Sequence, residues 1–329
     1  MTRQLPNGSG ALALLMLIAL STPAVGQRLR HAVDSAQVVV VATEVGARPL
    51  GTDHVVHTLQ VAKTLKGNPG ATISVLELEK VSLHHRPTTG QQRLYCLHDV
   101  TSKSIRAGLA QSGAPYFSMS GHAGSNPVVA NPAEDANCEL ARITIDSAAG
   151  VSPRKLVDRL LELALHGRGP ANLRTEAIDF IAERPALLGA LNPLQISDLV
   201  SRAIGETADI PFKISLASLC AEKGVDGLVD SLCISLDEVD DPRFARALGR
   251  IAAHMYGEKA LDVLQPHIVG ARRPQTRATL LLALGATSTE RALGALISMH
   301  ANKKNRPAVD AALRAHGDAR ALAVIGQDK

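Results

Sequence analysis

Four evenly spaced prolines constrain the fold of this 329-residue chain more than any other feature. Pro211, Pro242, Pro274 and Pro307 are separated by 31, 32 and 33 residues. Each is followed by a helical pattern of apolar residues, a short polar or Gly-bearing break, and a second helical pattern. Proline is tolerated in the first turn of a helix but not in its interior, so each one marks a helix start. The period therefore predicts a repeated helix pair.

A helix pair that recurs at a fixed period is typical of an α-solenoid, in which each unit packs only on its neighbours. The helical pattern begins less regularly at Ser152, a natural N-cap, and Pro153, which fits the first helical position. An ordinary helical bundle is the alternative for helices rich in Ala and Leu. The even spacing of the four prolines favours the solenoid.

The residues of these units also suggest a family. The segments DPR…RALGRIA, which starts at Asp241, and ERALGAL, which starts at Glu290, resemble HEAT-like repeats of the short PBS-lyase type. The resemblance is good over residues 210–325 and looser over 152–209. It implies a stacked, curved array whose concave face binds other macromolecules. Some enzymes of this kind use His-Glu pairs on their helices to hold a metal, and this chain has no helical His followed by Glu.

The first half of the chain has the period of β-strands. Residues 37–42 form a β-branched run, which suits a strand buried on both faces. Between His54 and Lys63 the pattern alternates, so Val55, His57, Leu59 and Val61 share one face. Further strands are expected at residues 73–78, 93–97, 116–120, 128–129 and 141–145. Short strands with irregular loops predict a small antiparallel barrel or sandwich.

Four segments of this half, DSAQVVVVATEV, LQVAKTLKG, ATISVLEL and QQRLYCL, resemble the small OB-like or netrin-like β-domain found at the front of many exported bacterial proteins. The resemblance covers Asp34 to roughly Leu97 and implies interaction rather than catalysis. Netrin-like protease inhibitors act through an N-terminal Cys, and the mature chain expected here begins at Gln27 instead. That mechanism is therefore not transferred.

The N-terminus has the layout of a secretory signal. A short polar segment with one cation, Arg3, precedes an unbroken run of ten apolar residues, Ala11 to Leu20. Small residues then stand at Ala24 and Gly26, which predicts cleavage after Gly26. A membrane-spanning helix needs roughly 20 apolar residues, about twice this run. We expect a soluble protein, exported to the periplasm or beyond, with no stable membrane insertion after the signal is removed.

These patterns predict an α+β multidomain chain: a signal peptide over 1–26, a small β-domain over 27–150, and a HEAT-like α-solenoid over 151–329. Export places the four cysteines in an oxidising space. Spacing alone cannot choose between the three possible pairings. One disulfide per half, Cys96–Cys138 and Cys220–Cys233, agrees best with the domains. Four buried free thiols are the alternative.

Composition argues against a nucleic-acid partner. Aromatic residues make up only 2% of the chain, and no run of Lys or Arg is longer than two. A surface that binds single-stranded nucleic acid needs exposed aromatic rings and a stripe of basic residues. Seven of the twelve histidines lie between His31 and His122. Cys96, His98 and His122 are residue types that suit zinc or copper, but nothing in their spacing requires a metal. We therefore expect no metal and no cofactor.

The function expected from the sequence is non-catalytic. The chain has no G-x-S-x-G, no H-E-x-x-H and no phosphate-binding glycine loop, so we expect no enzyme and no catalytic residue. Arg243, Arg246 and Arg250 recur at helical spacing and form a basic ridge that is a candidate partner-binding surface. The interpretation is an exported scaffold that binds a protein partner through its helical array. The alternative is a metal- or small-ligand-binding protein whose site is in the β-domain.

Overall fold

The structure, a computed structural model, describes residues 29–50, 54–78, 90–101, 116–119, 127–166, 169–301 and 306–326. These residues fall into two compact units, one ending at Ala177 and the other beginning at Ile178. The predicted signal peptide and its cleavage site lie outside the described residues.

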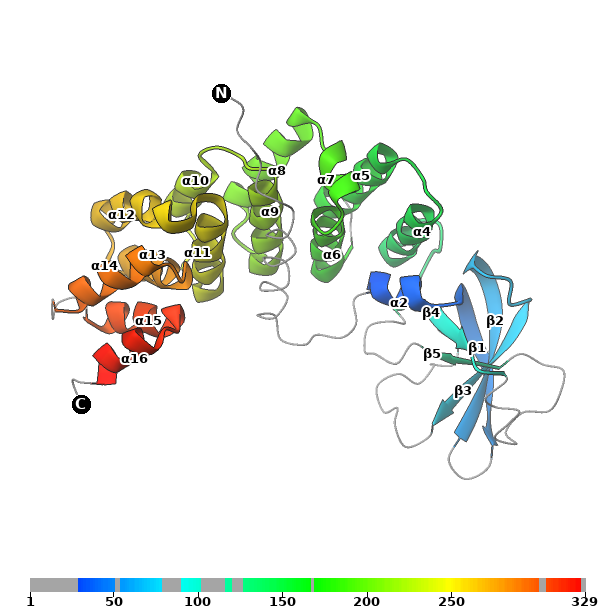
Figure 1. Cartoon of the computed structure of the whole chain (residues 1–329). Helices are drawn as coiled ribbons and strands as arrows, with labels where there is room; N and C mark the ends of the chain where they lie inside the picture. Colours follow the sequence, from blue (N-terminus) through cyan, green and yellow to red (C-terminus); the bar gives the residue numbers. More distant parts are fainter. Residues whose placement is uncertain are drawn as a thin grey trace. The chain divides into compact units, whose positions relative to one another are not determined.

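A small β-barrel forms the first part of the chain (Figure 1). Its strands close in the order β1-β2-β3-β5-β4, and only the β3–β5 pair is parallel. The strands are β1 (Val38–Leu50), β2 (His54–Lys66), β3 (Thr72–Leu78), β4 (Gln92–Asp99) and β5 (Tyr116–Met119). The predicted fold class, a small β-barrel followed by an array of helices, is confirmed.

The barrel interior follows the alternation of the sequence. Val40, Leu59, Val75, Tyr95 and Phe117 belong to one buried cluster, and Val61 packs against it. The face predicted for β2 is therefore the inward one. Strand β1 is fully buried from residue 38 to 42, as expected for a strand covered on both faces. Helix α2 (Leu29–Ser35) packs on α4 (Ala136–Ala148), and α4 also contacts β2.

The strand predicted at residues 141–145 is wrong, because these residues lie inside α4. The carboxylate of Asp135 caps the helix by accepting from the backbone N–H groups of Asn137 and Cys138. Leu140 and Ile143 then lie on one buried helical face. The N-cap, together with apolar residues buried at a spacing of three to four positions, favours a helix more strongly than a short β-branched segment favours a strand.

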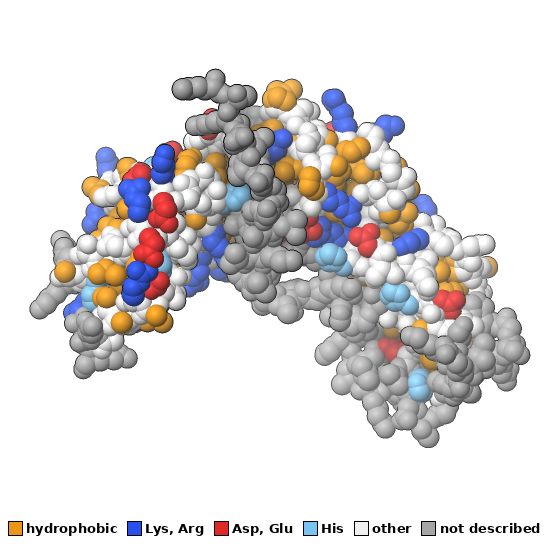
Figure 2. Space-filling model, in the orientation of Figure 1, with side chains coloured by type: hydrophobic (Ala, Val, Ile, Leu, Met, Phe, Trp, Pro, Cys, Tyr) orange, Lys and Arg blue, Asp and Glu red, His pale blue; other side chains and the backbone are white. Residues whose placement is uncertain are grey.

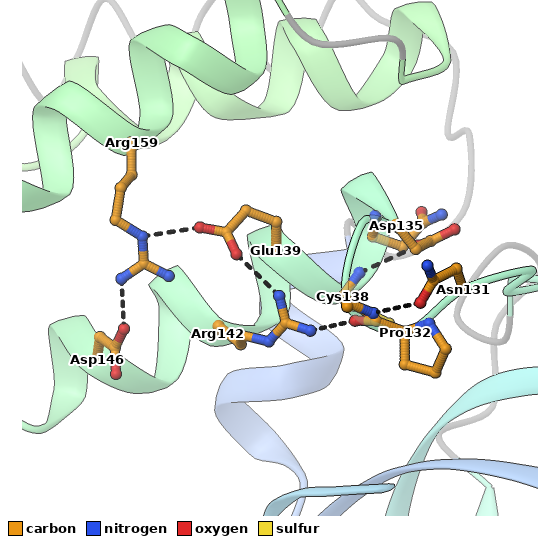
Figure 3. A network of polar contacts seen from close by, with 10 residues as sticks. Asn131, Pro132, Asp135, Cys138, Glu139, Arg142, Asp146 and Arg159 are labelled. Atoms are coloured by element: carbon orange, nitrogen blue, oxygen red, sulfur yellow. Dashed lines mark hydrogen bonds and ion pairs between the residues drawn. The ribbon is translucent and has the colours of Figure 1, made fainter. Parts of the chain in front are cut away.

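Two arginines join α4 to its surroundings (Figure 3). Helix α5 (Pro153–Leu161) begins at the proline where the sequence predicted it, and its Arg159 binds Glu139, at 2.7 Å, and Asp146. Arg142 binds Glu139 at 3.0 Å and also the carbonyl of Pro132. Burial raises the pKa of Glu139, but the hydrogen bonds from the two arginines outweigh it and lower that pKa. This network connects α4 to α5 and to the loop before α4.

Helical pairs build the rest of the chain. After a π-helical turn at Glu162–His166 come α6 (Ala171–Ala182), α7 (Pro185–Ala190), α8 (Pro193–Gly205), α9 (Ile210–Glu222), α10 (Leu228–Ser235), α11 (Pro242–Tyr256), a 3-10 turn (Gly257–Lys259), α12 (Ala260–Gly270), α13 (Pro274–Ala286), α14 (Glu290–His300), α15 (Arg306–His316) and α16 (Ala319–Gly326). The four evenly spaced prolines lie in the first turns of α9, α11, α13 and α15.

The pairs stack in two layers. Helices α9, α11, α13 and α15 contact one another in that order, and α10, α12, α14 and α16 do the same (Figure 1). Each helix of the first layer also packs on its partner of the second. Every unit therefore repeats the contacts of the one before, as the period of the prolines predicted.

Ion pairs link the C-terminal helices of the second layer. Arg291 of α14 binds Asp262 of α12 at 2.6 Å, and Arg320 of α16 binds Glu290 of α14. Figure 2 shows acidic and basic side chains close together over this part of the array. These pairs are exposed, so solvent screens them and each adds little to stability. They help to fix the register of successive pairs. In the parts of the chain that the structure describes, no helix is both long and apolar enough to cross a membrane.

Candidate functional site

An open pocket of about 450 Å³ lies between α10, α12 and the start of α13. Buried Cys233 and Leu280 form part of its lining, and Ile234 leaves 67% of its surface exposed beside them. The remaining lining comes from Asp237 after α10, from the end of α12, from Arg272 and Arg273, which precede α13, and from Thr276 of α13. The volume is within the range of small-ligand and peptide side-chain pockets.

Some of the charged side chains around the pocket have hydrogen-bond partners among the described residues, and one does not. Asp237 accepts a hydrogen bond from the hydroxyl of Thr276 at 2.7 Å, and its backbone carbonyl accepts one from Arg273 at 2.9 Å. His267 lies 2.8 Å from the carboxylate of Asp230. Arg272, in contrast, is exposed and makes no hydrogen bond or ion pair with a described residue. The charge that the wall offers to a ligand is therefore positive, next to an apolar side chain.

The predicted basic ridge lies on α11 and does not line this pocket. Arg243 is exposed and bound to Asp241, the N-cap of the same helix, at 2.8 Å. Arg246 is exposed, whereas Arg250 is partly buried. Burial lowers the pKa of Arg250, and the neighbouring charge of Arg246 lowers it further. Of the three arginines in the ridge, Arg243 is paired with Asp241, Arg246 is exposed and Arg250 is partly buried.

The structure corrects the expected disulfides. Cys96 lies on β4, Cys138 in the first turn of α4, Cys220 on α9 and Cys233 on α10, and all four are free, buried thiols. Neither Cys96–Cys138 nor Cys220–Cys233 forms, because no two of the four cysteines lie within disulfide distance of each other. The alternative of four buried thiols matches the structure. Burial raises the pKa of Cys96, Cys220 and Cys233 to about 12 and that of Cys138 to about 11.

The histidines considered as metal ligands do not form a centre that can be described. Cys96 and His98 lie on β4, and His122 lies outside the described residues. Among the described residues, no three His, Cys, Asp or Glu side chains are placed to hold a metal ion.

A buried ionisable cluster was missed by the sequence analysis. Glu44 of β1, His57 of β2 and Glu77 of β3 all point into the barrel. The Nδ1 atom of His57 is 3.1 Å from Oε1 of Glu44, and its Nε2 is 3.1 Å from Oε2 of Glu77. None of the three side chains is more than 10% exposed. A single imidazole ring thus bridges two carboxylates from neighbouring strands.

Two residues of β4, Arg93 and Tyr95, interact electrostatically with this cluster. Burial raises the pKa of Tyr95 to about 12; the charge of Arg93 opposes this, and those of Glu44 and Glu77 add to it. Among the described residues, the hydroxyl of Tyr95, Oε2 of Glu44 and Nε2 of His57 have no well-aligned hydrogen-bond partner, although Nε2 lies at ion-pair distance from Glu77. Such atoms cost about 1–3 kcal/mol each, so the interior is sensitive to any further change of charge.

The signal for this cluster was present in the alternation. Glu44 falls on the inward register of Val40 and Ala42, and Glu77 on that of Ile73 and Val75. A carboxylate at an inward position of a strand predicts a buried partner. Which strands are neighbours depends on the closure of the barrel, and the strand pattern alone leaves that open.

Compared with known proteins, the chain matches no protein-family model, no curated protein and no solved structure. Its function is argued from its own residues.

Proposed function

We propose that this chain is an exported, non-catalytic binding protein whose helical array presents a preformed surface to a partner protein. The observation that carries the proposal is the pocket between α10, α12 and α13, which is lined by both the exposed apolar side chain of Ile234 and the exposed cation of Arg272. Exposed large apolar side chains within a pocket are typical of interaction sites.

The architecture supports this use. The regular stacking of helix pairs, each opened by a proline, resembles that of HEAT-like arrays, which act mainly as binding surfaces. The five-stranded closed barrel agrees with an OB-like front domain. A surface built on packed helices is ordered before the partner arrives, so binding loses little conformational entropy.

The chemistry of the pocket defines the segment that it would bind. Asp237 is hydrogen-bonded by Thr276, and Asp230 is paired with His267. Two arginines, Arg272 and Arg273, line the pocket against the single carboxylate of Asp237, so the charge of the lining is net positive. A partner segment that places an apolar side chain against Ile234 and Leu280 and a carboxylate near Arg272 complements both properties.

Site-specific photocrosslinking in the native envelope tests this function with the full-length chain. A photoreactive residue in place of Ile234 is expected to capture one defined protein, and the same residue in place of Lys155, exposed on α5, is expected not to. Introducing Arg272→Glu into the first chain should lower the yield several-fold, because it reverses a positive charge of the pocket lining.

Arg246→Glu is the matched control, since it reverses an exposed arginine that does not line the pocket. Its yield should equal that of the parent chain. If Arg246→Glu removes the crosslink and Arg272→Glu does not, the basic ridge of α11 is the binding surface and the pocket assignment is wrong. Equal capture from Ile234 and Lys155 would also contradict the proposal.

Export is supported by the N-terminal pattern of a polar segment, ten apolar residues and small residues at Ala24 and Gly26. Intact-mass analysis of the protein isolated from its native envelope is expected to give a chain that begins at Gln27. Gly26→Pro should block processing and leave the precursor, because peptidases of this class need a small residue there. A native protein that retains Met1 or its neighbours would contradict export by this route.

A further inference from the structure

The Glu44–His57–Glu77 cluster joins three strands through side chains. Glu44 is on β1, His57 on the central strand β2, and Glu77 on β3, so one imidazole ring spans the sheet across two strand pairs. His57 pairs with Ala47 on one side and Val75 on the other in the backbone ladder. The cluster therefore lies across the β1–β2–β3 part of the barrel wall.

The backbone ladder is irregular beside this cluster. Residue pairing shifts between Glu44 and Gly46, which leaves Val45 as the extra residue of a bulge, and Val45 is 53% exposed. A bulge interrupts the regular hydrogen bonds of a strand pair. At this position the contact of Glu44 with His57 supplies a connection between β1 and β2 where the ladder is interrupted.

The bridge depends on one proton. A protonated imidazole donates from both ring nitrogens, so it can satisfy Glu44 and Glu77 together. A neutral imidazole donates from one nitrogen only, and its other nitrogen then faces a carboxylate lone pair. Loss of the proton therefore removes one of the two donors through which the ring joins Glu44 to Glu77, and the contact left behind is unfavourable in a low-dielectric interior.

The charged and titratable groups around the ring are few. From the strands that line this interior, the described groups are Glu44, Glu77, Arg93 and Tyr95, and β5 contributes Phe117 and Met119, which do not ionise. Burial tends to lower the pKa of His57, but hydrogen bonds to Glu77 and Glu44 and their charges outweigh it and raise that pKa. The surroundings thus favour the bridging, protonated form.

We propose that Glu44, His57 and Glu77 form a one-proton latch that closes the β1–β2–β3 wall of the barrel when His57 is protonated and loosens it when the proton leaves. The direction follows from the chemistry of the ring. Because the pKa of His57 is raised on folding, its stabilising contribution is complete below the unfolded value of 6.5 and is lost as the pH rises through the folded value. The barrel is closed in acid-to-neutral solution and opens towards alkaline pH.

Amide hydrogen exchange of the full-length chain, followed by NMR from pH 6 to pH 10, tests the latch. The exchange rates are expressed as protection factors, which correct for the base catalysis of exchange in an unfolded chain. These protection factors are expected to fall with rising pH at Ala47, His57 and Val75. The fall should approach about tenfold for each unit by which folding raises the pKa of His57. The nitrogen shifts of the His57 ring should report loss of its second N–H over the same pH range.

Two variants and a control separate the latch from a general effect of alkali. His57→Gln should make protection in this wall independent of pH, and Glu77→Gln should move the loss of protection to lower pH by removing one carboxylate. His54→Gln is the control, because His54 lies on the same strand and makes no ion pair with a described residue. It should behave like the unaltered chain.

The unaltered chain and Glu77→Gln decide the question even if His57→Gln does not fold. Protection that stays constant from pH 6 to pH 10 in the unaltered chain overturns the proposal. So does a loss of protection that Glu77→Gln leaves at the same pH, since the carboxylates would then not hold the proton.

Discussion

Gly249→Ala is expected to destabilise the helical unit by about 3 kcal/mol, the upper part of the range for overpacking a core. A Cβ atom at this position on α11 would lie 2.0 Å from the backbone carbonyl oxygen of Ala283 on α13. A backbone atom cannot rotate away as a side chain can, so the two helices must separate. For a unit of this size, thermal unfolding should move down by roughly 6–12 °C.

Gly294→Ala provides the matched control for that change. Gly294 lies within α14, is exposed, and would place its Cβ more than 4 Å from any neighbour. The same substitution there should raise stability by up to about 1 kcal/mol, because alanine favours the helix over glycine. Equal melting temperatures for the two variants would show that α11 and α13 are not in such close contact.

The same close approach recurs one pair later in the first layer of the array. A Cβ on Gly285 of α13 would lie 2.1 Å from the carbonyl oxygen of Ala312 on α15. In both cases a glycine lets the backbone of one helix approach that of the next. The sequence shows these glycines, but only the stacking of α11, α13 and α15 distinguishes them from an exposed glycine such as Gly294.

The helical half was predictable because its information is local. A proline in the first turn fixes where a helix starts, so Pro242 and Pro274 mark α11 and α13 without knowledge of any neighbour. The error at residues 141–145 has the opposite origin. There a β-branched segment has strand propensity, and the deciding contact is the cap from Asp135, which lies before the segment.

The candidate sites depended on contacts between distant residues, and the sequence could show them only in part. The sequence predicted that His57 shares one face of β2 with its apolar neighbours, and the structure shows that this face is the inward one. The partners of His57 lie 13 and 20 residues away, on strands whose pairing follows from barrel closure. The pocket beside Ile234 needs α10, α12 and α13 to be placed together. The exposed Arg272 carries no distinguishing pattern in the sequence until these helices bring it into the lining of one pocket with Ile234.

All four cysteines are expected to resist alkylation in the folded protein and to react fully in urea without any reductant. Burial raises the pKa of Cys96, Cys220 and Cys233 to about 12. At pH 8 such a thiol is about 0.01% thiolate, whereas an ordinary cysteine with a pKa of about 8.5 is roughly a quarter thiolate. With access also blocked, alkylation should be at least about 100-fold slower than in urea, as measured by mass spectrometry of each cysteine peptide.

Urea without reductant is the condition that separates free thiols from disulfides, since unfolding exposes thiols but breaks no S–S bond. Four labelled cysteines would agree with the structure, and none labelled until reductant is added would mean that both disulfides form after all. On the proposal that the chain is exported, protein isolated from the cell envelope makes the measurement decisive, because that compartment favours oxidation. Thiol–disulfide exchange needs a thiolate that can reach its target. Burial of Cys96 and Cys220 disfavours the thiolate and also blocks its access to a target. An exported chain of this fold can therefore keep its cysteines reduced without a reducing environment.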